Sequence, residues 1–80
     1  MYQVKAKLFA TLGCYRPGEL PGTPFEVALP PGETIDGLLA NLRVPVEEVK
    51  VVYVNGRARP LDWELQAGDE VGIFPPVGGG

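Results

Sequence analysis

The first part of the chain alternates between hydrophobic and polar side chains. Within residues 2–11 (YQVKAKLFAT), the even positions carry tyrosine, valine, alanine and leucine, and the odd positions are mainly polar. A half-buried β-strand has this period of two. Phe9 is the exception, because it places an aromatic ring on the polar face. Alternation returns at residues 25–29 (FEVAL), and the three prolines and three glycines of residues 13–24 predict a loop between two strands.

A different period follows residue 29. Four apolar residues recur with the spacing of one helical face: Ile35, Leu38, Leu39 and Leu42. The Thr34 hydroxyl can accept a hydrogen bond from a free amide of the first turn, Arg43 suits the negative end of the helix dipole, and Pro45 cannot continue a helix. The pattern predicts a single helix of about ten residues with one buried face.

The second half of the chain returns to short strands. Residues 49–54 (VKVVYV) are rich in β-branched side chains and lead into Asn55-Gly56, a sequence typical of a tight hairpin turn. A short return strand (RARP) and a turn at Gly68-Asp69 follow. Residues 70–74 (EVGIF) form the last predicted strand.

The predicted order is hairpin, helix, strand, short strand and last strand. One amphipathic helix laid over a mixed sheet gives a two-layer α+β domain. With the first and last strands adjacent at the centre, this is the β-grasp, or ubiquitin-like, arrangement: a mixed sheet of roughly four to five strands with one main helix packed on one face. A small barrel with an appended helix is the alternative. We predict one domain, residues 1–74, and a flexible tail, residues 75–80, because 80 residues support a single core.

Composition and charge exclude several classes of function. Asp and Glu outnumber Lys and Arg by 10 to 7, and the net charge of −3 argues against a nucleic-acid partner. The chain has no histidine, which excludes Ser-His and Cys-His catalytic pairs and most zinc sites, so we expect no bound metal. We find no signal-peptide pattern and no apolar run of about 20 residues that could span a bilayer. The expected location is therefore the cytoplasm, with no membrane partner.

Few side chains offer chemistry of their own. Cys14 has no histidine to deprotonate it, and we interpret it as incidental. Arg57 and Arg59 share a strand face if this segment is extended. They form either a solvated edge that discourages strand pairing or a contact for an acidic partner or a phosphate. Trp63 is interpreted as a core or semi-core aromatic. The fold therefore offers no convincing active site, which leaves the end of the sequence as the candidate reactive segment.

The sequence ends in IFPPVGGG. The fixed φ angles of Pro75 and Pro76 stiffen the exit from the last strand. Beyond Val77, three successive glycines have no Cβ, so they can extend through a channel too narrow for a side chain. A stiff base and a slender tip suit a carboxylate, on Gly80, that the active site of another protein must reach.

Several segments resemble the small subunit of molybdopterin synthase and its relatives, the ubiquitin-like sulfur carriers that include the thiamine-pathway carrier. The likeness covers nearly the whole chain: LFATL in the first strand, PPGETIDGLLANL around the helix, VNGR at 54–57, and L-x-x-GDEVGIFPPV from Leu65 to Val77, before Gly79 and Gly80. FPPV is similar to the molybdopterin branch, whereas VGGG is similar to the thiamine carriers. Gly78 stands where the molybdopterin pattern usually has another small residue, so both branches remain open.

The resemblance implies a non-catalytic, sulfur-donating subunit that binds no cofactor itself. A ubiquitin-activating-type adenylating enzyme would use Mg-ATP to adenylate the Gly80 carboxylate, and a persulfide sulfur donor would displace AMP to leave a thiocarboxylate. In the molybdopterin branch, the tail would enter the large subunit of molybdopterin synthase and pass sulfur to a pyranopterin precursor; in the thiamine branch, the partner would be thiazole synthase. The alternatives are a protein modifier joined through Gly80 to lysines of other proteins, and a binding module without covalent chemistry. The resemblance also favours contacts of Arg57 and Arg59 with acidic partner surfaces.

Partner docking should involve the face of the sheet opposite the helix. If Val71 and Ile73 face the helix, Phe74 faces outward, and Phe9 lies beside it on the neighbouring central strand. An exposed aromatic pair close to the tail is a reasonable docking patch. In the alternative arrangement, one of the two rings lies beneath the 13–24 loop.

Overall fold

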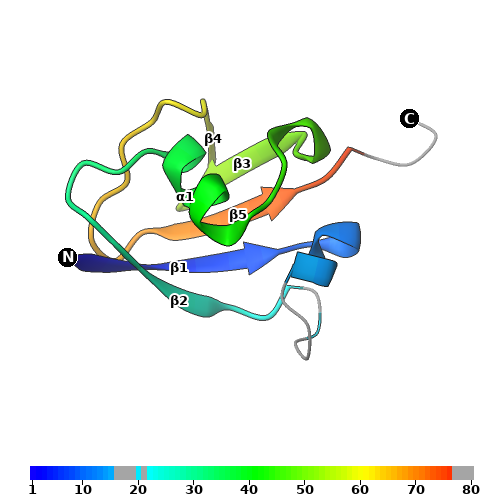
Figure 1. Cartoon of the computed structure of the whole chain (residues 1–80), viewed down its shortest axis with the longest axis horizontal. Coiled ribbons are helices and arrows are strands. Elements are labelled where there is room, and N and C mark those ends of the chain that lie inside the picture. The colour runs from blue at the N-terminus through cyan, green and yellow to red at the C-terminus, as the bar shows by residue number, and fades with distance from the viewer. Residues whose placement is uncertain (16–19, 21, 77–80) are drawn as a thin grey trace.

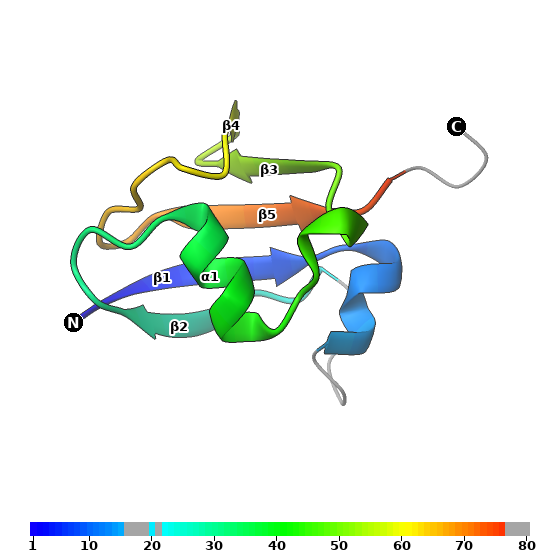
Figure 2. The ribbon, with the colours of Figure 1, turned by 45° about the horizontal axis from the view of Figure 1, so that its top comes forward.

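The computed structural model describes residues 1–15, 20 and 22–76 of the chain. In this part of the chain, one sheet has the strand order β2-β1-β5-β3-β4. Its strands are β1 (Tyr2–Leu8), β2 (Phe25–Leu29), β3 (Val51–Val54), β4 (Arg57–Arg59) and β5 (Glu70–Phe74). The helical elements are the α-helix α1 (Ile35–Leu42) and the 3-10 helices η1 (Ala10–Tyr15) and η2 (Val46–Glu48). Figures 1 and 2 show α1 lying across one face of the sheet.

The centre of the sheet joins the two ends of the sequence. β1 and β5 pair in parallel, with Ala6 opposite Val71 and Leu8 opposite Ile73. β2 pairs antiparallel with β1, while β3 pairs antiparallel with both β5 and β4. This is the β-grasp topology predicted from the order of the elements. The described strands form an open sheet with β2 and β4 at its edges, so the barrel alternative is wrong. β5 runs toward the end of the sheet opposite the N-terminus (Figure 1).

The helix begins where the sequence predicts and ends earlier. The Thr34 hydroxyl accepts a hydrogen bond from the Gly37 amide at 3.2 Å, which confirms the predicted N-cap. The helix has 8 residues because Arg43 adopts a left-handed conformation (φ 61°) and turns the chain before Pro45 is reached. Arg43 is therefore the C-cap, and its N–H donates to the Ala40 carbonyl at 3.1 Å.

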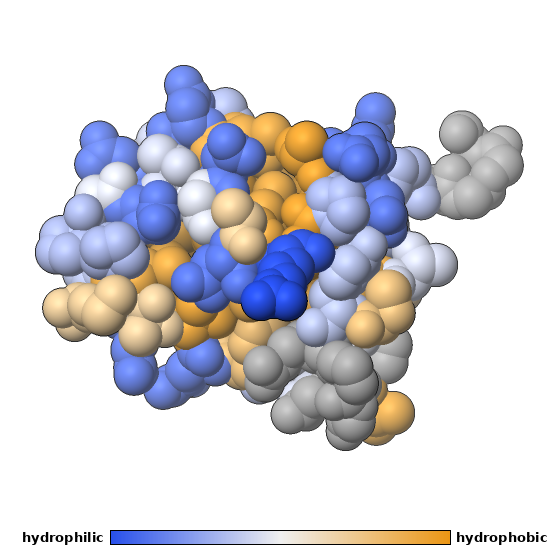
Figure 3. Space-filling view, in the orientation of Figure 1, coloured by the Kyte–Doolittle hydropathy of each residue, from blue (hydrophilic) through white to orange (hydrophobic). Residues whose placement is uncertain are grey.

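The hydrophobic core lies between α1 and the sheet. Its largest fully buried side chains are Val4, Leu12, Leu29, Ile35, Leu38, Leu39, Val52, Leu65, Val71 and Ile73. Each contributes about 1.5–3 kcal/mol of transfer free energy relative to an exposed position. On the face that carries α1, hydrophilic side chains surround the hydrophobic ones that remain visible (Figure 3). The core thus fixes which face of the sheet is covered and which side chains point to the other face.

Two predicted strands are longer than the observed ones. The alternation of residues 2–11 continues past Leu8, but Ala10 adopts φ 53° and the chain turns into η1. The expectation of an irregular loop from residue 13 misses this element, in which Leu12 is fully buried and covers one end of the core. The strand predicted at residues 49–54 begins at Val51, because η2 and the turn after it precede that residue.

Candidate docking face and tail exit

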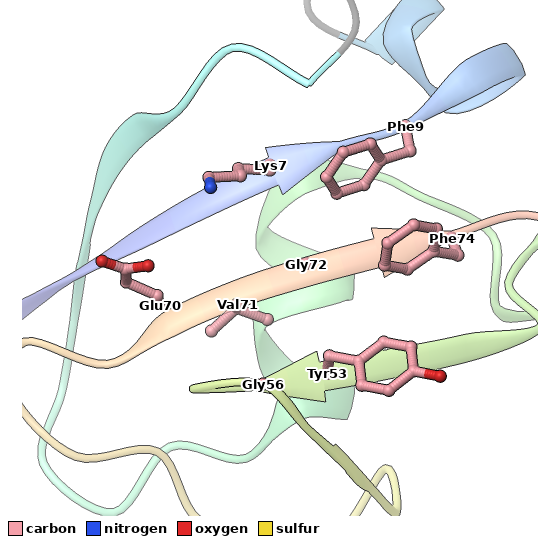
Figure 4. A pocket seen from close by; sticks show the side chains of 8 residues that line it. All are labelled: Lys7, Phe9, Tyr53, Gly56, Glu70, Val71, Gly72 and Phe74. Atoms are coloured by element: carbon pink, nitrogen blue, oxygen red, sulfur yellow. The ribbon is translucent and has the colours of Figure 1, made fainter.

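The face of the sheet opposite α1 carries an aromatic cluster. Because Val71 and Ile73 are buried against the helix, the alternation of β5 directs Phe74 to the other face. The rings of Phe9 and Phe74 stack with centroids 4.2 Å apart and planes 5° from parallel. Tyr53 of β3 meets Phe74 edge-on, with centroids 5.5 Å apart and an interplanar angle of 85° (Figure 4). The predicted proximity of the two phenylalanines is confirmed, and Tyr53 extends the cluster by one strand.

Gly72 provides the space beneath the stacked rings. It pairs with Lys7 of β1 and with Tyr53 of β3, so it lies at the middle of the open face. A Cβ at this position would lie 3.3 Å from Phe9 Cε2 and 3.4 Å from Phe74 Cε1. The first distance is shorter than most Cβ contacts in proteins, and the second lies at the lower limit of ordinary van der Waals contact. The absence of a side chain at Gly72 therefore lets both rings lie close to the sheet.

The end of the 13–24 loop borders the aromatic stack. The Gly22 amide donates to the Leu8 carbonyl at 2.8 Å, and a Cβ on Gly22 would lie 3.4 Å from Phe9 Cε1. Phe9 is thus half-buried, with one edge against this glycine and one face against Phe74. The two predicted arrangements of Phe9 coexist: the ring lies on the open face and also contacts the loop.

An open depression of about 320 Å³ follows this cluster along the sheet. It is lined by Lys7, Phe9, Tyr53, Gly56, Glu70, Val71, Gly72 and Phe74. Figure 4 shows the aromatic side chains at one end and the charged side chains of Lys7 and Glu70 toward the other. Tyr53 is 39% exposed, which is high for a large hydrophobic side chain. A partially exposed aromatic surface with a charged margin has the composition of a protein-binding site.

The last strand leaves the sheet beside this cluster. The Phe9 amide donates to the Ile73 carbonyl at 3.1 Å, and the Lys50 amide donates to the Phe74 carbonyl at 2.8 Å. Both neighbours therefore hold β5 up to its final residue. Pro75 is half-buried and Pro76 is exposed, and neither can donate a backbone hydrogen bond. The predicted tail residues Val77, Gly78, Gly79 and Gly80 lie outside the described residues.

The two 3-10 helices flank the point where β5 ends (Figures 1 and 2). The Tyr15 hydroxyl at the end of η1 donates to Glu48 Oε1 of η2 at 3.0 Å. Partial burial of the phenol, followed by the hydrogen bond to the Glu48 carboxylate, raises the pKa of Tyr15 above its ordinary value of 10.0. Both effects favour the protonated phenol, so the link between the two helices is intact at neutral pH.

Arg57 and Arg59 lie on the other side of the sheet. They pair with Val54 and Val52, whose side chains are buried on the helix side, so the arginines share that face, as predicted. Arg57 is exposed, but Arg59 is half-buried and its guanidinium lies 4.0 Å from the centroid of the Trp63 ring. The interpretation of Arg59 as part of a simple solvated edge is therefore wrong. Trp63 packs against the core, which confirms its interpretation as a semi-core aromatic.

The sequence, including the end of β5, matches the model of a known protein family. The ThiS family model matches residues 16–80, which is most of the sequence. The chain belongs to the ThiS family. The comparison with curated protein sequences gives no match. In the described part of this ThiS family chain, every helix is too short or too polar to cross a membrane.

Solved structures similar to this ThiS family chain include proteins with two different descriptions. A protein described as molybdopterin converting factor, subunit 1, from Pyrococcus furiosus is 30% identical, with a TM-score of 0.73; the match covers 96% of this chain and 100% of that one. Small archaeal modifier protein 1 of H. volcanii is 27% identical, with a TM-score of 0.74, and the match again covers 96% and 100%. The ThiS family chain therefore has the ubiquitin-like fold that sulfur carriers and modifiers share.

Sequence reasoning missed two parts of the docking face. Tyr53 has the exposed parity of a strand in which Val52 and Val54 are buried, so the period of two could have placed it on the open face. The role of Gly72 depends on how the two phenylalanine rings lie, and no sequence pattern reports that. Of the four side chains predicted to bind partners, the structure brings Phe9 and Phe74 together and places the two arginines on the opposite face.

Proposed function

We propose that this chain is a sulfur carrier, the small subunit of a molybdopterin synthase, and that its Gly80 carboxylate becomes a thiocarboxylate. The observation that carries the proposal is the end of β5 at Phe74, because Pro75 and Pro76, which lead into the tail, begin directly beside the aromatic face. The similarity to the P. furiosus protein, at 30% identity over nearly the full length of both chains, supports the molybdopterin branch.

The chemistry requires activation of the carboxylate by a partner. A carboxylate is a poor acyl donor, so a ubiquitin-activating-type enzyme would use Mg-ATP: a Gly80 oxygen attacks the α-phosphorus and pyrophosphate leaves. The sulfur of a persulfide donor then attacks the acyl carbon and AMP leaves. A thiol cleaves the resulting acyl disulfide, which forms a disulfide with the donor and releases the thiocarboxylate. The carrier contributes only its terminus to these steps, and the partner enzymes supply Mg-ATP, the acid-base groups and the pocket.

The folded body would present the tail and bind each partner in turn. Phe9, Phe74 and Tyr53 form a stacked, partly exposed group of the kind that dominates binding energy at protein interfaces. The group adjoins the tail exit, so a protein bound to it would have the tail within reach of its active site. The large subunit of the synthase would use the same face when the tail delivers sulfur.

A specific observation favours a second function. Small archaeal modifier protein 1 is 27% identical over nearly the whole chain, which supports a modifier joined through Gly80 to lysines. The family model is that of the ThiS family, which supports the thiamine-pathway carrier with thiazole synthase as its partner. All three functions begin with adenylation of the same carboxylate and differ in the nucleophile that follows.

The test is intact mass spectrometry of the chain after incubation with Mg-ATP, an adenylating enzyme and a persulfide donor. We expect a mass gain equal to the replacement of one oxygen by sulfur, located in the C-terminal peptide. Gly80→Ala should reduce the conversion, and one residue added after Gly80 should abolish it, while both variants keep the same thermal midpoint. No gain with an enzyme that converts a reference carrier would refute the proposal.

The fate of the sulfur separates the three functions. Transfer to a pyranopterin precursor with a large synthase subunit supports the molybdopterin role, and transfer with thiazole synthase supports the thiamine role. Lysine-linked Gly-Gly remnants on other proteins, with no sulfur transfer, support the modifier role.

A further inference from the structure

Two side-chain donors in the described residues are buried and have no hydrogen-bond partner: Arg59 Nε and Trp63 Nε1. Leaving a buried N–H without an acceptor costs about 1–3 kcal/mol. Buried polar groups in folded proteins are nearly always paired, so such a group calls for an explanation. Here the two donors belong to residues that touch each other, because the Arg59 guanidinium lies 4.0 Å from the centroid of the Trp63 ring.

The Trp63 ring holds Arg59 in place without using its donors. Stacking restricts a side chain that would otherwise lose much rotamer entropy on binding. Among the residues that the structure describes, no carboxylate or carbonyl accepts a hydrogen bond from this guanidinium. The arginine is thus fixed in position: its Nε–H is buried, and its terminal N–H groups, which are not among the buried unpaired atoms, remain free to donate. A planar guanidinium of this kind binds a carboxylate through two parallel hydrogen bonds.

The surroundings of Arg59 indicate what supplies the acceptor. β4 is an edge strand that pairs with β3 on one side, and Arg57 lies on the same face of it. The outer edge of β4 can accept an additional strand, which is a common way to bind an extended peptide. Two arginines at this edge favour a segment that carries acidic side chains, and the net charge of −3 makes a nucleic-acid phosphate a poor alternative.

Neighbouring acidic residues limit the direction from which an acidic partner segment can approach Arg59. Asp62 and Glu64 line, with Trp63 and Gln66, a polar depression of about 390 Å³. The Glu64 carboxylate is directed toward the 30–34 turn, since its Oε1 lies 3.6 Å from the position of a Cβ on Gly32. An acidic side chain entering from this depression would be repelled. An acidic side chain that binds Arg59 would therefore approach along the edge of β4 and not through this depression.

We propose that the β4 edge, with Arg59 held by Trp63, is a second docking site, which binds an extended protein segment that bears a carboxylate. Arg59 receives the carboxylate, and Arg57 adds long-range attraction. The site lies on the face of the sheet opposite Phe9 and Phe74, so one partner can occupy it while another occupies the aromatic face. It does not involve Gly80 and stands whether or not the chain carries sulfur.

The test is a titration of the ¹⁵N-labelled full chain, followed by NMR, with a capped peptide of alternating valine and glutamate. The chain has one tryptophan, so the indole N–H of Trp63 gives a single signal. We expect saturable shifts of that signal and of the β4 amides. The matched valine–glutamine peptide should bind about tenfold more weakly or worse, because a neutral amide replaces the carboxylate. Arg59→Gln should abolish the shifts, Arg59→Lys should weaken them, and Arg57→Gln should leave most of the affinity.

Several outcomes would overturn the proposal. The first is the absence of saturation at millimolar peptide, and the second is equal binding of the valine–glutamine peptide. The third is a loss of affinity in Arg57→Gln as large as that in Arg59→Gln, because this would indicate diffuse electrostatic attraction and not a specific contact with Arg59. Loss of binding in Phe74→Ala would place the peptide on the aromatic face instead. Trp63→Phe keeps a ring beneath Arg59 and removes the indole N–H, so it should retain part of the affinity. Thermal midpoints of all variants establish that each is folded.

Discussion

The rings of Phe9 and Phe74 stack at 4.2 Å, although one residue follows the first strand of the chain and the other ends the last. The parallel pairing of β1 and β5 brings them together, and their position at the end of β5 places the stack beside the tail exit. The topology therefore couples two features: the strand that leads into the tail also carries Phe74, one of the three rings of the aromatic cluster. A partner that bound this cluster would have Pro75, where the tail begins, close to its own surface.

The stack should dominate binding of the adenylating partner. Phe74→Ala removes a half-buried ring that contacts both Phe9 and Tyr53, and we expect a loss of about 2 kcal/mol, or roughly thirtyfold in Kd. Phe9→Ala should have a similar effect. Isothermal titration calorimetry with the partner enzyme measures it.

The matched control for this substitution is Val46→Ala, which truncates a side chain that is 44% exposed in η2 and outside the aromatic cluster. Its Kd should stay within about twofold of the native value, because isolated exposed contacts contribute little. If Phe74→Ala also binds within twofold while remaining folded, the aromatic face is not the docking site.

Most of the fold could be predicted from the sequence, because residues 2–8, 25–29 and 70–74 alternate cleanly and one helix has a clear apolar stripe. The same periodicity, applied to a parallel central pair, predicted that Phe9 and Phe74 are neighbours. η1 could not be found in this way, since its six residues, 10–15 (ATLGCY), are too few to show a helical period. The Arg59–Trp63 stack was also missed, because it joins β4 to the irregular crossover after it.

Gly72→Ala should move the aromatic rings without unfolding the protein. The new methyl group would lie 3.3 Å from Phe9 Cε2 and 3.4 Å from Phe74 Cε1, so the rings must tilt away by a few tenths of an ångström. We expect reduced ring-current shifts at the stack in NMR spectra and a loss of about 1 kcal/mol in partner affinity.

Gly56→Ala serves as the comparison, because its Cβ would meet nothing within 4 Å but its backbone is left-handed at φ +85°. It should lower stability by about 1–2 kcal/mol through backbone strain and leave the ring-current shifts unchanged. Native ring-current shifts in Gly72→Ala would show that the rings tolerate a side chain beneath them.

Asp69 should contribute more to stability than an exposed acidic residue such as Asp62. It is 8% exposed, and its carboxylate accepts hydrogen bonds from the Asn55 side chain at 2.9 Å and from the Gln66 amide at 2.8 Å. Asp69→Ala leaves both donors unpaired, so we expect the free energy of unfolding in urea to fall by about 2 kcal/mol. Asp62→Ala, an exposed position, should change it by less than about 0.5 kcal/mol. Equal effects of the two substitutions would contradict this role.

Tyr15 should make stability depend on pH in the alkaline range. Its pKa in the folded protein is raised above 10.0 by partial burial and by the hydrogen bond to Glu48, so the folded state holds the phenolic proton more tightly than the unfolded state does. The resulting stabilisation is fully present below pH 10 and is lost as the pH rises through the folded-state pKa. Urea unfolding from about pH 9 to about pH 11 should therefore show a steeper decline for the native chain than for Tyr15→Phe. Parallel curves for the native chain and Tyr15→Phe would mean that the Tyr15–Glu48 link does not persist in solution.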